Sequence, residues 1–130
     1  MRTLLAIALV ASCLLCGTSC KPRAKSMLPL VNMTNLVADC QKLAEEGAKL
    51  GREFWDRADP LPPTIAALAP QYVHLSIRES ATVVDIQFSG GFYHRGYLVV
   101  CASKDPNFVP QKGRNWRVTK VAPGVFEYRE

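Results

Sequence analysis

Residues 72–88, YVHLSIRESATVVDIQF, contain two stretches in which apolar and polar side chains alternate along the chain. A period of two is typical of β-strands that bury one face, because successive side chains point to opposite sides of a strand. A short turn at Glu79–Ala81 joins the two strands. The apolar positions expected to face the core are Val73, Leu75, Ile77, Val84, Ile86 and Phe88.

Further strands are predicted after this pair. Residues 97–102 are apolar on both faces, which suits a strand in the middle of a sheet. Residues 116–121 and 125–129 follow and are joined by a turn at Ala122–Gly124. Their inward positions are Trp116, Val118, Phe126 and Tyr128. The chain from residue 72 onward therefore predicts an antiparallel meander of four or five strands.

The segment before the sheet predicts a long helix, from Asn32 or Thr34 to Arg57. Its apolar residues recur in steps of three and four, which places them in one narrow stripe. This stripe either lies on the sheet or pairs with a partner's helix, and Gly47 within it indicates close packing. The stripe consists of Met33, Leu36, Cys40, Leu43, Gly47, Leu50 and Phe54.

A short helix is predicted over residues 63–69, because Pro63 suits a first helical position and Pro70 stops the helix. Ile65 and Leu68 would face the core. Helices followed by a run of strands indicate an α+β fold. This order also resembles the heads of pilins and pseudopilins in topology, but the Gly-Phe-type cleavage site and the glutamate of that family are missing from the sequence.

Residues 1–20, MRTLLAIALVASCLLCGTSC, have the three parts of a secretory signal. Arg2 supplies the positive charge, Leu4–Leu15 is apolar, and the small residues 17–19 follow. The apolar run is shorter than the roughly 20 residues that a membrane-spanning helix needs. We therefore expect export and removal of this segment.

The end of this signal resembles the lipobox of bacterial lipoproteins, in which an apolar residue and two small residues precede a cysteine. The resemblance implies acylation of the cysteine, by chains such as palmitate, and cleavage just before it. We prefer Cys20, because cleavage there removes the whole apolar run and leaves a polar tether. Cys13 remains the alternative, because Val10–Ser12 before it fits the local pattern better. A third hypothesis is ordinary cleavage of the signal peptide without attachment of a lipid.

The resemblance implies a signal peptide at 1–19. The charged stretch with Pro22 and Pro29 that follows predicts a tether at 20–30, and the remaining length suits a single small domain at 31–130. The lipobox resemblance places this domain on the bacterial cell envelope, in the periplasm or outside, held to a membrane by a lipid anchor. An envelope protein is the candidate partner. The net charge of +5 falls to +4 when Arg2 is removed, and the basic residues are scattered. Nucleic-acid binding needs a denser basic stripe, so we expect none.

Cys40 and Cys101 are the two cysteines of the domain. In an oxidising compartment such a pair can form a disulfide. The bridge would close a loop of about 60 residues and contribute about 4 kcal/mol in the chain-entropy model. Two buried free thiols, packed as small apolar residues, are the alternative.

The domain contains no motif of an established catalytic class. It lacks GxSxG, HExxH, CxxC and phosphate-loop patterns, and the chain has 2 histidines. His74 falls on the polar side of its strand and is predicted to be a surface residue. We therefore expect no catalytic residue, no metal and no cofactor.

One loop is a candidate ligand site. Residues 89–96, SGGFYHRG, place Tyr93, His94 and Arg95 between glycines that would let the backbone approach an anion. A plain hairpin connection that needs glycine is the alternative. Asp85 and His94 are predicted to come close across this hairpin.

Three functions fit these observations. The first is a lipid-anchored envelope protein with a non-enzymatic binding or structural domain. The second is a component of a secretion or pilus-like assembly that uses the helix stripe. The third is a small envelope enzyme that uses the loop at His94.

Overall fold

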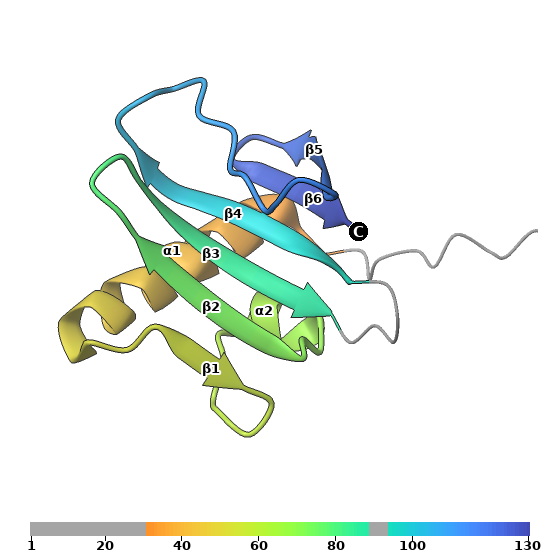
Figure 1. Ribbon diagram of the computed structural model, residues 1–130. Helices are drawn as coiled ribbons and strands as arrows, with labels where there is room; N and C mark the ends of the chain where they lie inside the picture. Colours follow the sequence, from red (N-terminus) through yellow and green to blue (C-terminus); the bar gives the residue numbers. More distant parts are fainter. Residues whose placement is uncertain (1–30, 89–93) are drawn as a thin grey trace, which may run out of the picture.

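The computed structural model describes residues 31–88 and 94–130. The expected signal, the tether and Tyr93 lie outside these residues. Within them, six antiparallel strands form one sheet in the order β1-β2-β3-β4-β6-β5, accompanied by two helices (Figure 1). The elements are α1 (Met33–Leu50), β1 (Phe54–Asp56), α2 (Pro63–Ala67), β2 (Tyr72–Ile77), β3 (Ala81–Phe88), β4 (Arg95–Ser103), β5 (Arg117–Ala122) and β6 (Val125–Arg129).

The α+β class predicted from the sequence is confirmed, and the alternating stretch 72–88 forms the hairpin β2–β3. Val73 pairs with Ile86, and Leu75 pairs with Val84. All four side chains are fully buried, because they share the inward face of the pleat. Ile77, the last expected core residue of β2, is 48% exposed instead.

The long helix is shorter than predicted, and the difference supplies a sixth strand. Helix α1 ends at Leu50, and Gly51 adopts the left-handed conformation with φ 64°. The N–H of Arg52 donates to the carbonyl of Gly47 at 2.8 Å, which closes the helix end in the manner of a Schellman motif. The chain is then free to extend, and Phe54–Asp56 pairs with β2 as β1.

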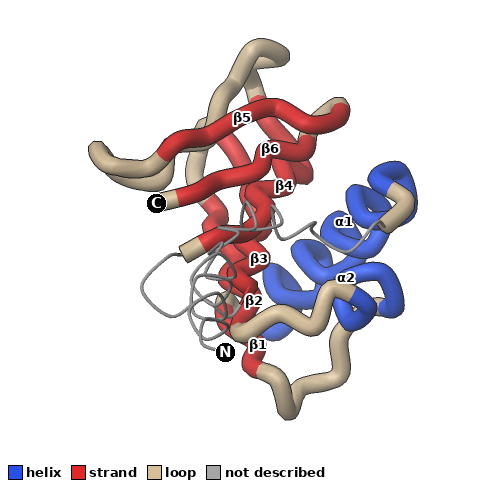
Figure 2. The backbone as a smooth tube through the Cα atoms, turned by 90° about the vertical axis from the view of Figure 1, so that its right-hand side faces the viewer, coloured by secondary structure: helices blue, strands red, loops and turns tan. Residues whose placement is uncertain are grey.

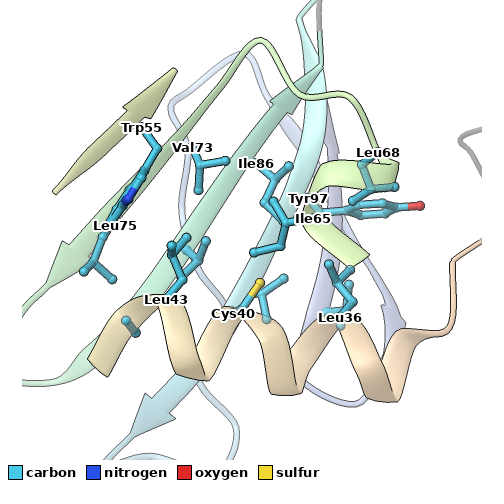
Figure 3. Packing of buried hydrophobic residues seen from close by; sticks show 14 residues of the cluster. Leu36, Cys40, Leu43, Trp55, Ile65, Leu68, Val73, Leu75, Ile86 and Tyr97 are labelled. Carbon is cyan, nitrogen blue, oxygen red and sulfur yellow. The ribbon is translucent and has the colours of Figure 1, made fainter. Parts of the chain in front are cut away.

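Both helices pack on the same face of the sheet (Figure 2), which we call the helix-covered face. The stripe of α1 therefore meets the sheet of its own domain. Leu36, Cys40 and Leu43 point from α1 into the main core (Figure 3). Gly47 permits a close contact between α1 and the sheet, because a Cβ there would lie 2.6 Å from Leu75 Cδ2 and 2.8 Å from the Trp55 ring.

The short helix α2 ends two residues earlier than predicted and is held against α1. Its core contacts are the expected ones, since Ile65 and Leu68 are almost fully buried. The N–H of Thr64 donates to the carboxylate of Asp39 on α1 at 2.8 Å. This bond satisfies a free amide at the start of α2, so one buried acid joins the two helices.

The sheet is not the simple meander that the sequence predicted. Strand β6 pairs with β4, and β5 lies beyond β6 at the edge. The connection 104–116 therefore passes β6 before β5 begins. A strand's spatial neighbour is set by long-range pairing, which the periodicity of the sequence does not encode. Neither α1 nor α2 is long and apolar enough to span a bilayer.

Candidate functional site

The opposite face of the sheet, which no described helix covers, we call the helix-free face. Its apolar centre is small and consists of Leu98, Phe126 and Tyr128, with Val83, Val100, Trp116 and Val118 packed against it. Asp85 and Gln87 of β3 also belong to this face, because they alternate with Val84 and Ile86. Two buried polar residues on one strand need partners, and the partners define the site.

Asp85 is the centre of the first polar group. Its side chain is 12% exposed. The hydroxyl of Tyr128 donates to Asp85 Oδ1 at 2.8 Å, and Lys112 Nζ donates to Oδ2. The Lys112 ammonium also lies 4.6 Å from the centre of the Tyr128 ring and 5.4 Å from that of Trp116. The connection 104–116 thus places the Lys112 ammonium against the buried Asp85 carboxylate and near the rings of Trp116 and Tyr128.

Gln87 is the centre of the second polar group. Its Oε1 accepts from the Tyr72 hydroxyl, and its Nε2 lies 3.0 Å from His94 Nδ1. Because the amide nitrogen can only donate, Nδ1 accepts, and a neutral His94 carries its proton on Nε2. That nitrogen faces the Glu130 carboxylate at 3.7 Å. His94 also stacks on Trp116, with ring centres 5.8 Å apart.

Gly96 makes room for this arrangement. A Cβ at this position would lie 2.2 Å from the carbonyl oxygen of Ile86 and 2.5 Å from the Tyr128 hydroxyl. Gly96 pairs with Tyr128 across β4 and β6 and with Gln87 across β4 and β3. The absence of a side chain therefore lets the Tyr128 ring lie flat enough to reach Asp85.

The hydroxyls of Tyr72 and Tyr128 are protonated and donate hydrogen bonds. Burial, followed by the negative charge of Asp85, raises the pKa of Tyr128 far above its usual value. Burial and Asp85 also raise the pKa of Tyr72. Both hydroxyls therefore keep their protons at physiological pH and serve as hydrogen-bond donors. In the described part of the chain, no buried side-chain N or O atom lacks a partner.

A groove of about 460 Å³ opens beside the Asp85–Lys112 pair. One wall is the polar row of β2, and the other is the connection 104–116. Asp85 and Lys112 belong both to the groove and to the polar group around Tyr128. The remaining lining residues are His74, Ser76, Arg78, Ser80, Ala81, Val83, Leu98, Phe108, Pro110 and Gln111.

The structure separates two of the residues that the sequence placed in one ligand loop. His94 lies on the helix-free face with Gln87 and Trp116. Arg95 pairs with Glu127 at 2.8 Å, and both belong to the alternate positions on the helix-covered side. Asp85 and His94 are not bonded to each other, since Lys112 and Gln87 are their respective partners. His74 is exposed, as predicted, and lines the groove.

The two cysteines of the domain face the helix-covered core as free thiols. Burial, then the negative charges that Cys101 and Asp39 would carry, raises the pKa of Cys40 well above its usual range. Burial raises the pKa of Cys101 to about 12. Neither thiol is therefore an activated nucleophile. No cluster of three or more metal-ligating side chains occurs among residues 31–88 and 94–130.

Sequence reasoning missed Lys112, Gln87 and the polar role of Tyr128. One signal was available, because Asp85 and Gln87 interrupt an apolar strand at alternate positions and so mark a face with polar partners. The partners themselves could not be found this way. Lys112 lies 27 residues from Asp85, and Tyr128 lies 43 residues away.

Comparison with protein-family models, with curated proteins and with solved structures gives no match to this chain. The functional argument therefore rests on the geometry of the helix-free face.

Proposed function

We propose that this chain is a lipid-anchored envelope protein whose domain binds a ligand through the helix-free face. The observation that carries the proposal is the groove beside the buried Asp85–Lys112 pair. A concave site with an apolar floor and a few fixed polar groups is the usual form of a ligand pocket. The expected anchor at Cys20, or Cys13, would hold this face near a membrane.

Binding is favoured over catalysis by the state of the polar groups. Asp85, Gln87 and His94 are all engaged by other side chains. The phenols are held in their neutral form, and the thiols lie on the other face with raised pKa values. A nucleophile activated by a base, which most covalent mechanisms need, does not occur among these contacts. Such a network orients side chains and shapes a surface.

The assembly hypothesis has less support than binding through the groove. It requires the stripe of α1 to meet a helix of another protein. Leu36, Cys40, Leu43 and Gly47 are instead buried against the sheet of their own domain. Leu50 alone of the stripe on α1 is strongly exposed, at 64%.

The anchor is tested by the intact mass of the full chain isolated from membranes. We expect a diacylglyceryl mass on a chain that begins at Cys20, and release from the membrane in Cys20→Ala. Retention of the lipid in Cys20→Ala would move the anchor to Cys13. An unmodified, unattached wild-type chain would contradict the lipid anchor.

The binding face is tested by photo-crosslinking in the cell. A benzoylphenylalanine replaces His74 in the groove or, as a matched control, Lys42, whose side chain is 75% exposed on α1. We expect one discrete adduct from position 74 and none from position 42. An adduct from position 42 alone would contradict the proposed face.

A further inference from the structure

The groove has one polar wall, one apolar wall and a floor of aliphatic side chains. The polar wall is formed by His74, Ser76 and Arg78, which are successive outward positions of β2 and its end. From position 74 to position 78 the strand advances about 13 Å. Phe108 and Pro110 form the facing wall. A ligand in this groove would therefore contact polar groups along one side and apolar groups along the other.

The negative charge inside the groove is already engaged. Asp85 accepts from Tyr128 at one oxygen and from Lys112 at the other. The acid that follows Arg78, Glu79, pairs with Lys104 at 3.6 Å. What the groove still offers to a ligand is therefore mainly hydrogen-bond donors.

Arg78 is the strongest of these donors. Among the residues that the structure describes, no carboxylate pairs with its guanidinium, whose Nε donates to Ser76 Oγ at 3.4 Å. A guanidinium presents donors in a planar fork that matches a carboxylate or a phosphate. His74 and Gln111 add further donors along the same groove.

From this arrangement we infer that the groove binds a small organic anion, in which a carboxylate or phosphate is joined to an apolar body. The anionic group meets Arg78, and the apolar body lies between Phe108, Pro110 and the floor of Val83 and Leu98. The volume of about 460 Å³ is within the usual range for small-molecule sites. This inference rests on the proposed function, because it takes the helix-free face as the ligand face.

The test is a titration of the full chain in a neutral detergent, followed residue by residue in amide NMR spectra. The probes are benzoate, phenyl phosphate and benzylamine, which share an aromatic body and differ in the charged group. We expect both anions to cause saturable shifts at residues 74–85 and 108–112, and benzylamine to cause none. The ratio of the two anion affinities then distinguishes a carboxylate ligand from a phosphate ligand.

Two variants test whether the guanidinium of Arg78 binds the anionic group of the probes. Arg78→Gln removes the exposed guanidinium and is expected to weaken the binding of both anions about tenfold, as the loss of a charge-assisted pair does. Lys49→Gln removes one positive charge from the exposed side of α1 and should leave both affinities unchanged. Circular dichroism should show the wild-type fold in both variants.

The outcomes separate this inference from the proposed function. Equal binding of benzylamine and the anions in the groove, or unchanged affinity in Arg78→Gln, overturns the anion assignment and leaves the helix-free face as the ligand face. Shifts confined to α1 contradict both proposals. The absence of saturable shifts with either anion overturns the inference, and crosslinking at position 74 then decides the proposed function alone.

Discussion

The two faces of the sheet are built on different principles. Among residues 31–88 and 94–130, the helix-covered face joins fourteen buried residues in one cluster, whereas the helix-free face buries three in its own. On the covered face the buried acid Asp39 serves the fold, because it binds the start of α2. On the helix-free face Asp85 and Gln87 are satisfied by side chains that surround a groove. We therefore expect the first face to supply most of the stability, and we propose that the second carries the function.

This division predicts that the largest losses of stability come from the helix-covered face. The first test concerns Cys40 and Cys101, which face that core. The structure holds them as free thiols, and we propose that they form a bridge when the chain is in an oxidising compartment. Reduction of the bridge should lower the free energy of unfolding by about 4 kcal/mol.

The measurement is urea denaturation with and without reductant, together with the intact mass. A mass 2 Da lower without reductant, on the order expected for the loss of two hydrogens, would show the bridge. Two alkylatable thiols in the unfolded, unreduced chain would rule it out. In the reduced, folded protein we expect slow alkylation at pH 8, because burial raises both thiol pKa values.

The second test removes apolar volume from the covered core. Leu43 is 1% exposed, and Leu43→Ala should lower the free energy of unfolding by about 3 kcal/mol, through lost burial and the cavity left behind. Leu50→Ala makes the same chemical change on the same helix at a side chain 64% exposed, and should cost less than about 0.5 kcal/mol. Equal losses would contradict the placement of α1 on the sheet.

The third test adds one methyl group to each face. Gly96→Ala places a Cβ against the backbone of Ile86 and the Tyr128 ring, so we expect a loss of about 2 kcal/mol. In a Trp55→Phe background Trp116 is the remaining tryptophan, and its ring centre lies 5.2 Å from that of Tyr128. Gly96→Ala should therefore change the fluorescence of Trp116. Gly47→Ala in the same background should destabilise without changing that fluorescence. A response of Trp116 to Gly47→Ala would mean that the two faces are coupled.

The smallest expected effect is a pH dependence. Burial opposes the ionisation of Glu127, but hydrogen bonds from Arg129 and Arg95 outweigh it and lower its pKa. The ionised Glu127, with its two arginine partners, therefore stabilises the fold at pH values above the unfolded-state pKa of about 4.3. This contribution is lost as the pH falls through the lower pKa that Glu127 has in the folded state. Glu127→Gln should cost about 0.5 kcal/mol at pH 7 and nothing in strong acid. A difference that persists at low pH would exclude this origin.

The sequence was sufficient for most of the fold, because alternation and helical periodicity are local signals of burial. It predicted the hairpin β2–β3, the central position of β4 and the core contacts of α2. The end of α1 was missed, although Gly51 after Lys49 and Leu50 is a common termination pattern. The predicted helix also included residues 54–56, so β1 was not recognised. The buried Trp55 did not distinguish the two structures, because it is buried just as well from a strand as from a helix.

The site was less accessible to prediction than the fold. The placement of β5 beyond β6 depends on which strands pair, and it brings Lys112 over Asp85. Arg95 follows His94 in the chain, yet strand alternation sends the two side chains to opposite faces. Neighbours in sequence were therefore a poor guide to a site assembled from β3, β6 and the connection 104–116.

The central claim is that the polar pair of the helix-free face is not needed for stability. The most direct measurement is the free energy of unfolding of the triple variant Asp85→Leu/Lys112→Met/Tyr128→Phe, in which Tyr128→Phe removes the buried hydroxyl that would otherwise lose its acceptor. An apolar replacement of a buried pair is often neutral or stabilising, whereas loss of one partner leaves an uncompensated group. We predict that Lys112→Met alone costs about 2 kcal/mol, and that the triple variant regains wild-type stability. A triple variant as unstable as the single one would contradict the account.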